Sequence, residues 1–304
     1  DVSEPISLMR DIVGVSGNGY AFCALRSDGS LVAWGILGFA GALPPPIPAL
    51  RDVVKVIGNL NAFAALRANG SVVAWGDQTN GGNLPAAIAA LTDIVDIVAT
   101  GYAFAALCAN GAVVAWGSTG RGGVVPAEIG VLIDVVELSG TERAFAARRS
   151  NGSVVAWGGG AHGANVPAPI ALLTDIRTIT GNSGSFVALL SSGRTVGWGS
   201  QAIPAPVALL TDIVQVVCGG VAFAALRANG TVVAWGVADR GGEIPEAIAA
   251  RLVNVRAIYS NTHAFAALTS SGEVVTWGRG PAGGNSDGVA DQLNGKIFYE
   301  ATAL

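Results

Sequence analysis

Residues 62–76 read AFAALRANGSVVAWG, and residues 222–236 read AFAALRANGTVVAWG. The two stretches differ at one position, Ser71 against Thr231, although 160 positions separate them. Every tryptophan of the chain belongs to the same pattern, with spacings of 41, 41, 41, 41, 37 and 42 residues: Trp34, Trp75, Trp116, Trp157, Trp198, Trp235 and Trp277. A phenylalanine lies twelve residues before each of them. A period near 41 residues is typical of a repeat protein.

Each repeat has the pattern of a series of short strands. A β-branched segment such as DIVDI (93–97) is followed by AFAAL, a turn signal of the Asn-Gly type, and VVAWG. Asn-Gly takes the positive φ angles that tight hairpins use, and valine and tryptophan favour pleated surfaces. A glycine-containing loop closed by proline follows, as in DQTNGGNLP (77–85). The apolar piece after that proline, such as AAIAAL (86–91), is predicted to form either a fourth strand or a helical turn.

Seven units of three or four antiparallel strands, without a helical period, predict an all-β fold: a seven-bladed β-propeller built from tandem repeats of about 41 residues. One small sheet cannot bury both of its faces, so neighbouring sheets must cover them. We expect the repeated phenylalanine and tryptophan to pack between blades, while the alanines of AFAAL allow close approach. We therefore expect a single domain over residues 1–304, monomeric as a closed ring, with residues 293–304 as a ring-closing strand.

The two ends of the chain also allow other interpretations. The stretch LNGKIFYEATAL (293–304) resembles the start of an eighth repeat, which would be the cut edge of a longer array. The chain begins with Asp1 and not with methionine, so we expect either a processed form or a piece of a longer protein.

A recurring acidic residue precedes the first strand of the repeats. It lies 23 residues before six of the seven tryptophans, and asparagine replaces it in the last repeat: Asp11, Asp52, Asp93, Asp134, Asp175, Asp212 and Asn254. A ring of carboxylates is one interpretation. Aspartate at such a position commonly accepts hydrogen bonds from nearby backbone N–H groups, so we predict a turn or cap role.

Composition and charge exclude several classes of function. The net charge is −4, and no run of basic residues provides a footprint for nucleic acid. Mean hydropathy is +0.52, but polar residues or glycine interrupt every apolar run, so we predict no membrane span. Cys23, Cys108 and Cys218 occupy three different positions of the repeat, and the two histidines have no metal-ligand spacing. We therefore predict no disulfide ladder, no metal and no cofactor.

The stretch ALRANGSVVAWG (65–76), followed by a Gly-Gly pair and an apolar residue, resembles the repeat of the regulator-of-chromosome-condensation family. The form VVAWG…GGxxP is similar to that of bacterial secreted β-lactamase-inhibitor propellers of the same superfamily. The resemblance extends from about Pro5 to Trp277 and implies a seven-bladed propeller, a bacterial origin, a secreted or cell-surface location, and inhibition of a target protein. These repeats have Ala-Phe in the region where the family carries histidine, and they lack Gly-Gln-Leu-Gly, so no functional residue is transferred.

In a repeat array, function is expected where the copies differ. Because strand direction alternates, the loop before AFAAL and the loop after Trp-Gly are predicted to lie on one face, the variable face. Their aromatic, arginine, asparagine and histidine side chains are typical of protein-binding surfaces, although loop drift without selection is an alternative. We predict that thirteen residues of this face contact a partner: Tyr20, Phe39, Asn61, Asp77, Tyr102, Arg121, Glu142, Arg143, His162, Asp239, Arg240, His263 and Arg279.

The favoured hypothesis is a non-enzymatic binding or scaffold propeller that recognises a macromolecular partner through the variable face. A protein is the preferred kind of partner. A second hypothesis is an enzyme with a polar site assembled from loops at the central axis, for which Glu142, Arg143, His162, Arg240 and His263 are the residues to test. The sequence contains no G-x-S-x-G or metal-protease motif, so we lean against this hypothesis and predict no catalytic residue. A third hypothesis is a purely structural repeat module of a larger surface or secreted protein.

Overall fold

The computed structural model describes residues 8–293 of the 304-residue chain. In this part the chain forms seven three-stranded antiparallel sheets, one for each repeat, which we number as blades 1 to 7 in chain order. Helix α7 (Ala290–Leu293) contains the first residue of the predicted ring-closing strand, and residues 294–304 lie outside the described residues. The ring-closing strand and the single-domain organisation therefore stay predictions.

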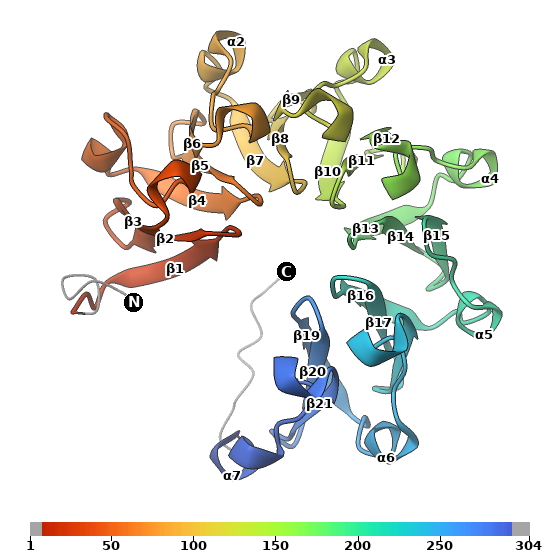
Figure 1. Cartoon of the computed structure of the whole chain (residues 1–304). Helices are drawn as coiled ribbons and strands as arrows, with labels where there is room; N and C mark the ends of the chain where they lie inside the picture. Colours follow the sequence, from red (N-terminus) through yellow and green to blue (C-terminus); the bar gives the residue numbers. More distant parts are fainter. Residues whose placement is uncertain (1–7, 294–304) are drawn as a thin grey trace. The chain divides into compact units, whose positions relative to one another are not determined.

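The chain divides into two compact units, residues 1–166 and residues 167–304. Unit 1 contains blades 1 to 4, with strands β1 (Ile12–Gly17), β2 (Ala21–Arg26), β3 (Leu31–Gly35), β4 (Val53–Gly58), β5 (Ala62–Arg67), β6 (Val72–Gly76), β7 (Ile94–Ala99), β8 (Ala103–Cys108), β9 (Val113–Gly117), β10 (Val135–Gly140), β11 (Ala144–Arg149) and β12 (Val154–Gly158). Within this unit, β1, β4, β7 and β10 lie along one side of the row of blades, and helices α2 (Ala86–Ala89) and α3 (Ala127–Gly130) lie on the other (Figure 1).

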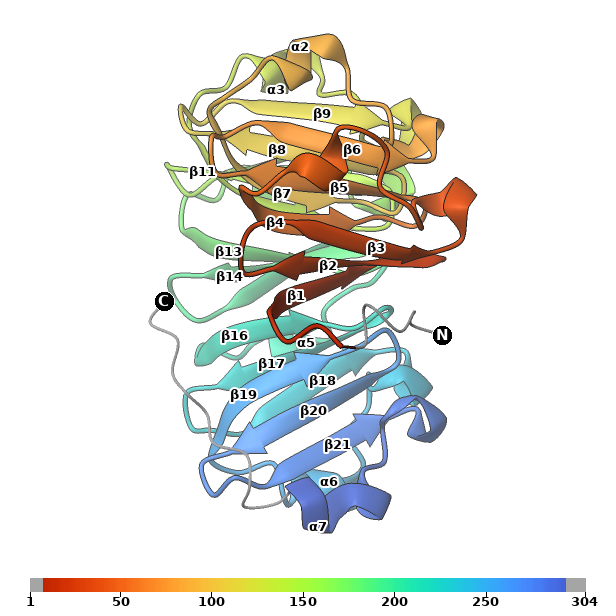
Figure 2. The same ribbon diagram turned by 90° about the vertical axis from the view of Figure 1, so that its left-hand side faces the viewer.

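Unit 2 contains blades 5 to 7. Its strands are β13 (Ile176–Gly181), β14 (Ser185–Leu190), β15 (Thr195–Gly199), β16 (Ile213–Cys218), β17 (Ala222–Arg227), β18 (Val232–Gly236), β19 (Val255–Ser260), β20 (Ala264–Thr269) and β21 (Val274–Gly278). Its one-turn helices are α4 (Ala168–Ala171), α5 (Ala205–Ala208), α6 (Glu246–Ala249) and α7. Figure 2 shows the three strands of the last blade, β19, β20 and β21, side by side.

The apolar piece after the loop proline forms a helical turn and not a fourth strand. In blade 2, Pro85 is the N-cap of α2, and the backbone N–H of Ala89 donates to the carbonyl of Pro85 at 2.9 Å. Proline fixes a φ angle that suits the beginning of a helix, and the alanines that follow have the highest helix propensity. The turn also buries Ile88 against the blade core. This settles the alternative that the sequence left open.

The hairpin with Asn-Gly is a three-residue loop. In blade 2 the N–H of Arg67 donates to the carbonyl of Ser71 at 2.9 Å, which leaves residues 68–70 as the loop. Gly70 has a φ of +76°, whereas Asn69 does not have a positive φ. The side-chain oxygen of Asn69 instead accepts from the N–H and the hydroxyl of Ser71 at 3.0 and 2.7 Å. The predicted positive φ is therefore confirmed for glycine and wrong for asparagine, because only the last residue of such a loop is left-handed.

Phenylalanine and tryptophan pack between neighbouring blades of each unit, as predicted. In unit 1, Phe104 and Trp116 of blade 3 are buried in one cluster with Ala62 and Ala64 of blade 2. In unit 2, Phe265 and Trp277 of blade 7 pack in the same way on Ala222 and Ala224 of blade 6. Indole N–H groups donate to a loop carbonyl of the preceding blade: Trp75 to Ala40 at 3.2 Å, Trp116 to Gly81 at 3.0 Å, Trp157 to Gly122 at 3.0 Å and Trp277 to Gly241 at 3.1 Å.

Four of the six recurring aspartates form ion pairs with arginine. Four carboxylates lie beside the arginine at the end of the second strand of their own blade: Asp11 with Arg26 at 2.7 Å, Asp52 with Arg67 at 2.9 Å, Asp134 with Arg149 at 2.9 Å and Asp212 with Arg227 at 3.0 Å. The predicted side-chain cap was wrong for these four. Antiparallel pairing places Val53, next to Asp52, opposite Arg67, so the guanidinium reaches the carboxylate. The pairs of Asp52, Asp134 and Asp212 are partly exposed, so each contributes about 0.2–1 kcal/mol.

Candidate functional site

The two variable loops of each blade lie at the same end of its sheet, as predicted. In blade 3 the N–H of Ser118, which follows Trp-Gly, donates to the carbonyl of Tyr102, which precedes the second strand, at 3.0 Å. Equivalent bonds join Ile36 to Tyr20, Asp77 to Asn61 and Gly159 to Arg143 in unit 1, and Ser200 to Gly184, Val237 to Val221 and Arg279 to His263 in unit 2. The two loops of a blade are therefore held together by the same backbone contact in every repeat.

A polar side chain at the end of the first strand provides a second link. The hydroxyl of Thr100 donates to the carbonyl of Arg121 at 3.1 Å and accepts from the N–H of Ala103 at 2.9 Å. In other blades the corresponding side chain also donates to a backbone carbonyl of the later loop: Asn18 to Phe39 at 2.9 Å, Asn59 to Asn80 at 2.6 Å, Thr141 to His162 at 2.9 Å and Asn261 to Ala282 at 2.8 Å. Sequence reasoning missed this role, although asparagine or threonine occupies the position in six of the seven repeats.

In six of the seven blades, all except blade 5, this constant frame presents two variable side chains. The first precedes the second strand, and the second ends the short 3-10 turn after Trp-Gly: η1 (Leu37–Phe39), η3 (Gln78–Asn80), η4 (Thr119–Arg121), η5 (Gly160–His162), η6 (Ala238–Arg240) and η7 (Gly280–Ala282). The pairs, 19 residues apart, are Tyr20 with Phe39, Asn61 with Asn80, Tyr102 with Arg121, Arg143 with His162, Val221 with Arg240, and His263 with Ala282. Nine of the thirteen predicted residues belong to these pairs; Asn80, Val221 and Ala282 were missed.

Backbone hydrogen bonds between neighbouring blades fix the loops before the second strand. In unit 1 each N–H donates to a backbone carbonyl of the next blade: Gly19 to Leu60 at 3.0 Å, Leu60 to Gly101 at 3.1 Å, and Gly101 to Glu142 at 2.8 Å. In unit 2 the N–H of Ser183 donates to Gly220, and that of Gly220 donates to Thr262, at 2.9 and 3.0 Å. The variable side chains of each unit therefore stand on a continuous hydrogen-bonded support, which reduces the entropy that they would lose on binding.

Two of the pairs contain aromatic rings in direct contact with their partner. The rings of Tyr20 and Phe39 lie 4.4 Å apart at an interplanar angle of 30°. The guanidinium carbon of Arg121 lies 3.7 Å from the centre of the Tyr102 ring. Cation–π contacts of this kind contribute about 0.5–1 kcal/mol at exposed sites and more when water is excluded. Both contacts order large side chains before any partner arrives.

The densest group of predicted residues is the Tyr102 cluster, which consists of Tyr102, Arg121, Glu142 and Arg143. The guanidinium of Arg143 lies 5.9 Å from the Tyr102 ring, and its Nε is 3.1 Å from Oε1 of Glu142. All four residues are half-buried, and they come from the neighbouring blades 3 and 4. The carbonyl of Glu142 accepts the N–H of Gly101, which joins the two blades within the cluster.

Asp77 has a structural role in its loop. Its carboxylate accepts from the N–H and hydroxyl of Thr79 at 2.9 and 2.6 Å, and from the N–H and side-chain amide of Asn80 at 3.0 Å each. These bonds cap the turn η3. The bond from the Thr79 hydroxyl is the main cause that lowers the pKa of Asp77.

Replacing Asp77 by alanine is expected to lower the free energy of unfolding by about 1 kcal/mol at neutral pH, because the cap is lost. The carboxyl has a lower pKa in the folded state than its unfolded value of about 3.9, so its contribution is present above that value and is lost as the pH falls through the folded-state pKa. Urea titrations of wild type and Asp77→Ala along a pH series measure the difference. Asp77→Asn, which keeps one acceptor, is the control. A difference that persists unchanged in acid would contradict this account.

The remaining predicted residues do not form a second cluster of this kind. In blade 6 of unit 2, Nε of Arg240 lies 3.8 Å from a carboxylate oxygen of Asp239. His162 belongs to unit 1, whereas His263 and Arg279 belong to unit 2. Within residues 8–293, no group of three or more His, Cys, Asp and Glu side chains is arranged to hold a metal ion.

The cysteines are poor nucleophiles. Burial raises the pKa of the Cys23 thiol to about 12 and is the main cause that raises that of Cys108 to about 11. The thiolate is the reactive form of cysteine, so these two side chains remain protonated and inert at neutral pH.

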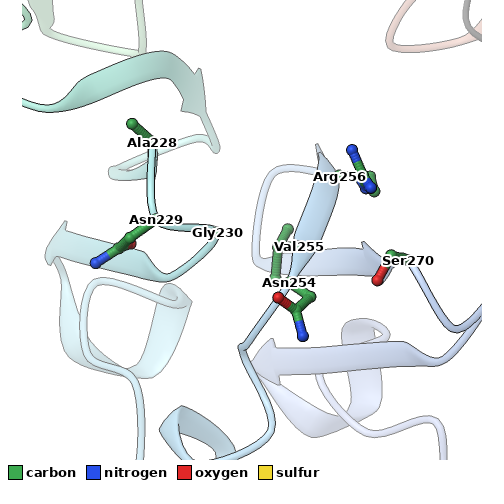
Figure 3. Close-up of a pocket in the computed structure, with 7 residues that line it drawn as sticks. All are labelled: Ala228, Asn229, Gly230, Asn254, Val255, Arg256 and Ser270. Carbon is green, nitrogen blue, oxygen red and sulfur yellow. The ribbon is translucent and has the colours of Figure 1, made fainter.

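A hollow of about 250 Å³ lies between blades 6 and 7 of unit 2. It is lined by Ala228, Asn229, Gly230, Asn254, Val255, Arg256 and Ser270. Its polar groups do not converge: the amide nitrogen of Asn229 points away from Asn254, and the guanidinium of Arg256 points away from both (Figure 3). Small-molecule sites combine an enclosed apolar lining with convergent polar groups, so this hollow does not qualify as one.

Comparisons with known proteins bear on the fold. No protein-family model matches the sequence, and a comparison with curated proteins finds no match.

Among the helices in residues 8–293, none has the length and apolar character needed to cross a membrane.

Several solved structures are similar to this chain. The ectodomain of the receptor kinase CR4 from Physcomitrella patens has a TM-score of 0.55 at 18% identity, covering 87% of this chain and 71% of that one. The CRINKLY WD40 ectodomain of the Arabidopsis thaliana receptor kinase ACR4 has a TM-score of 0.53 at 17% identity, with coverage of 89% and 96%. Yeast RCC1 (Prp20), in a complex with Kap60, has a TM-score of 0.50 at 16% identity, with coverage of 89% and 70%.

The chain has the fold of a seven-bladed β-propeller. At these identities the likeness shows the fold alone, and it confirms the expected resemblance to regulator-of-chromosome-condensation propellers at that level. The comparisons give no support to the finer resemblance to bacterial inhibitor propellers.

Proposed function

We propose that this propeller is a non-enzymatic binding module that recognises a protein partner through the variable ends of its blades, with the Tyr102 cluster as an anchor. The observation that carries the proposal is the constant frame of backbone bonds, which holds a different pair of side chains in six of the seven repeats. Tyrosine and arginine, the residues that dominate the energy of protein interfaces, are half-buried and already in contact in this cluster. Among the similar structures, yeast RCC1 is seen with the protein Kap60 bound.

The other expectations extend this proposal without being needed for it. A monomeric single domain, secretion, a bacterial origin and inhibition of the bound protein belong to this group. The enzyme alternative draws on Glu142 and Arg143, but these two side chains pair with each other at 3.1 Å. This pairing favours a binding surface over a general acid or base.

The combined variant Tyr102→Ala, Arg121→Ala, Arg143→Ala tests the proposed function. The full chain is used for affinity capture from the cells of origin and their medium, and the dissociation constant of each captured protein is then measured after purification. Loss of even one anchor costs about 2 kcal/mol, so we expect binding at least roughly 30-fold weaker than that of wild type.

The matched control replaces three exposed charged residues outside the variable loops, Glu128, Arg194 and Arg256, by alanine. No ion pair involves these three side chains within residues 8–293. The control variant is expected to bind like wild type. A partner that tolerates the triple variant of the Tyr102 cluster, or that is weakened equally by the control, contradicts the proposal, as does the absence of any partner.

A further inference from the structure

We infer that the Tyr102 cluster takes up a carboxylate side chain, so that the partner presents an acidic segment to the variable face. This inference rests on the proposed function and specifies the chemistry of the partner at that site. It follows from the number and placement of the charges around one tyrosine ring.

Arg121 is the first part of the argument. Its guanidinium stacks on the Tyr102 ring at 3.7 Å, and within residues 8–293 no carboxylate forms a salt bridge with it. A guanidinium has five N–H donors at its edge, and stacking on a ring face leaves this edge accessible. Other arginines of unit 1 do have a carboxylate partner: Arg26, Arg51, Arg67, Arg143, Arg148 and Arg149. Among the residues that the structure describes, Arg121 is thus an ordered cation without an anion.

The second part of the argument is the charge balance of the cluster. Arg121 and Arg143 bring two positive charges to the same ring, and Glu142 brings one negative charge. The cluster is therefore net positive by one charge, whereas the whole chain has a net charge of −4. Two half-buried guanidinium groups near one ring repel each other, and an added carboxylate that accepts from both removes this repulsion and forms charge-assisted hydrogen bonds.

Glu142 is the third part of the argument. Its carboxylate binds Nε of Arg143 at 3.1 Å, and about a third of each of the two side chains is exposed. A carboxylate of the partner must therefore approach a site that already holds one carboxylate. Glu142 acts as an internal competitor that weakens the binding of acidic groups. Removing its charge is expected to tighten binding, which a residue with a merely structural role would not do.

The test uses the full chain and two blocked peptides, hexaglutamate and hexaglutamine, as probes. Binding is followed by the Nε–Hε NMR signals of the arginines and by calorimetry, at an ionic strength low enough for a Debye length above about 10 Å. We expect hexaglutamate to shift the signals of Arg121 and Arg143 in a saturable manner and hexaglutamine to leave them unchanged. Added salt is expected to weaken the binding, since the site remains partly exposed.

Charge-neutralising variants give the expected pattern of affinities for hexaglutamate. Arg121→Gln should weaken binding roughly fivefold or more, and Glu142→Gln should strengthen it roughly two- to fivefold, as for partly exposed charge pairs. Arg121→Lys keeps the charge without the planar edge and should fall between wild type and Arg121→Gln. Arg194→Gln removes an exposed arginine at a hairpin and is the matched control, with no change expected.

Three results would overturn the inference: equal binding of hexaglutamine, unchanged affinity in Arg121→Gln, or weaker binding in Glu142→Gln. The two hypotheses fail in different ways. If a captured partner depends on the cluster but hexaglutamate does not bind, the carboxylate inference fails and the proposed function stands. If no partner depends on the cluster, the proposed function fails whatever the peptide does.

Discussion

Replacing Phe104 by alanine should lower the free energy of unfolding by about 3–5 kcal/mol, the range for deleting a fully buried aromatic side chain. The ring has no exposed surface and stacks on Trp116 with centres 5.3 Å apart. The ring also packs closely against the loop of the preceding blade, where a Cβ built on Gly81 would lie 2.6 Å from Cδ2 of Phe104. The deletion therefore opens a cavity, which the loop at Gly81 has no side chain to fill. Urea denaturation of the full chain measures the loss.

Phe22 offers a matched control for this prediction. It occupies the same position of blade 1 and stacks on Trp34 in the same way, with centres 5.6 Å apart, but half of its surface is exposed. Phe22→Ala is therefore expected to cost less than half as much as Phe104→Ala, because the stabilisation scales with the apolar area removed from water. Equal losses in the two variants would contradict the prediction and would mean that another surface covers the Phe22 ring in solution.

Replacing Gly117 by alanine should lower the free energy of unfolding by about 2–6 kcal/mol. Its φ of +108° strains any L-residue with a side chain, which contributes about 1–3 kcal/mol. The new Cβ would also lie 2.8 Å from Cα of Ala103 and from the carbonyl oxygen of Tyr102. Both are backbone atoms that cannot rotate away, and overpacking of this kind contributes about 1–3 kcal/mol. Thermal and urea denaturation provide the measurement.

Gly120, three residues further along the same loop, is the control. A Cβ on Gly120 meets no atom within 4 Å, and its φ is not positive. Gly120→Ala is expected to change stability by no more than about 0.5 kcal/mol. Because the N–H of Ser118 bonds to Tyr102, Gly117→Ala should also disturb the Tyr102 cluster, visible as a changed NMR signal of Arg121. A small cost for Gly117→Ala, or equal costs in the two variants, would contradict the prediction.

The features that the sequence predicted well are those that depend on local pattern. The Phe–Trp series, the strands and the loop ends of each blade follow from residues close in sequence, and the same pattern recurs seven times. The role of Asp52 was predicted wrongly because its partner, Arg67, lies fifteen residues away and reaches it only through antiparallel pairing. Thr100 was missed for a similar reason, since its acceptor at Arg121 belongs to a later loop.

In the candidate site, too, the individual residues could be predicted from the local sequence, whereas their contacts could not. Tyr102, Arg121, Glu142 and Arg143 were each predicted from their loops, but nothing in the sequence indicated that both guanidinium groups approach one ring or that Glu142 pairs with Arg143. The repeat, its strands and the end of each blade at which variation occurs can be read from the chain alone, because hydrophobic period and turn residues act over short distances. Which charges meet depends on the packing of the blades, because only that packing brings side chains of different repeats together.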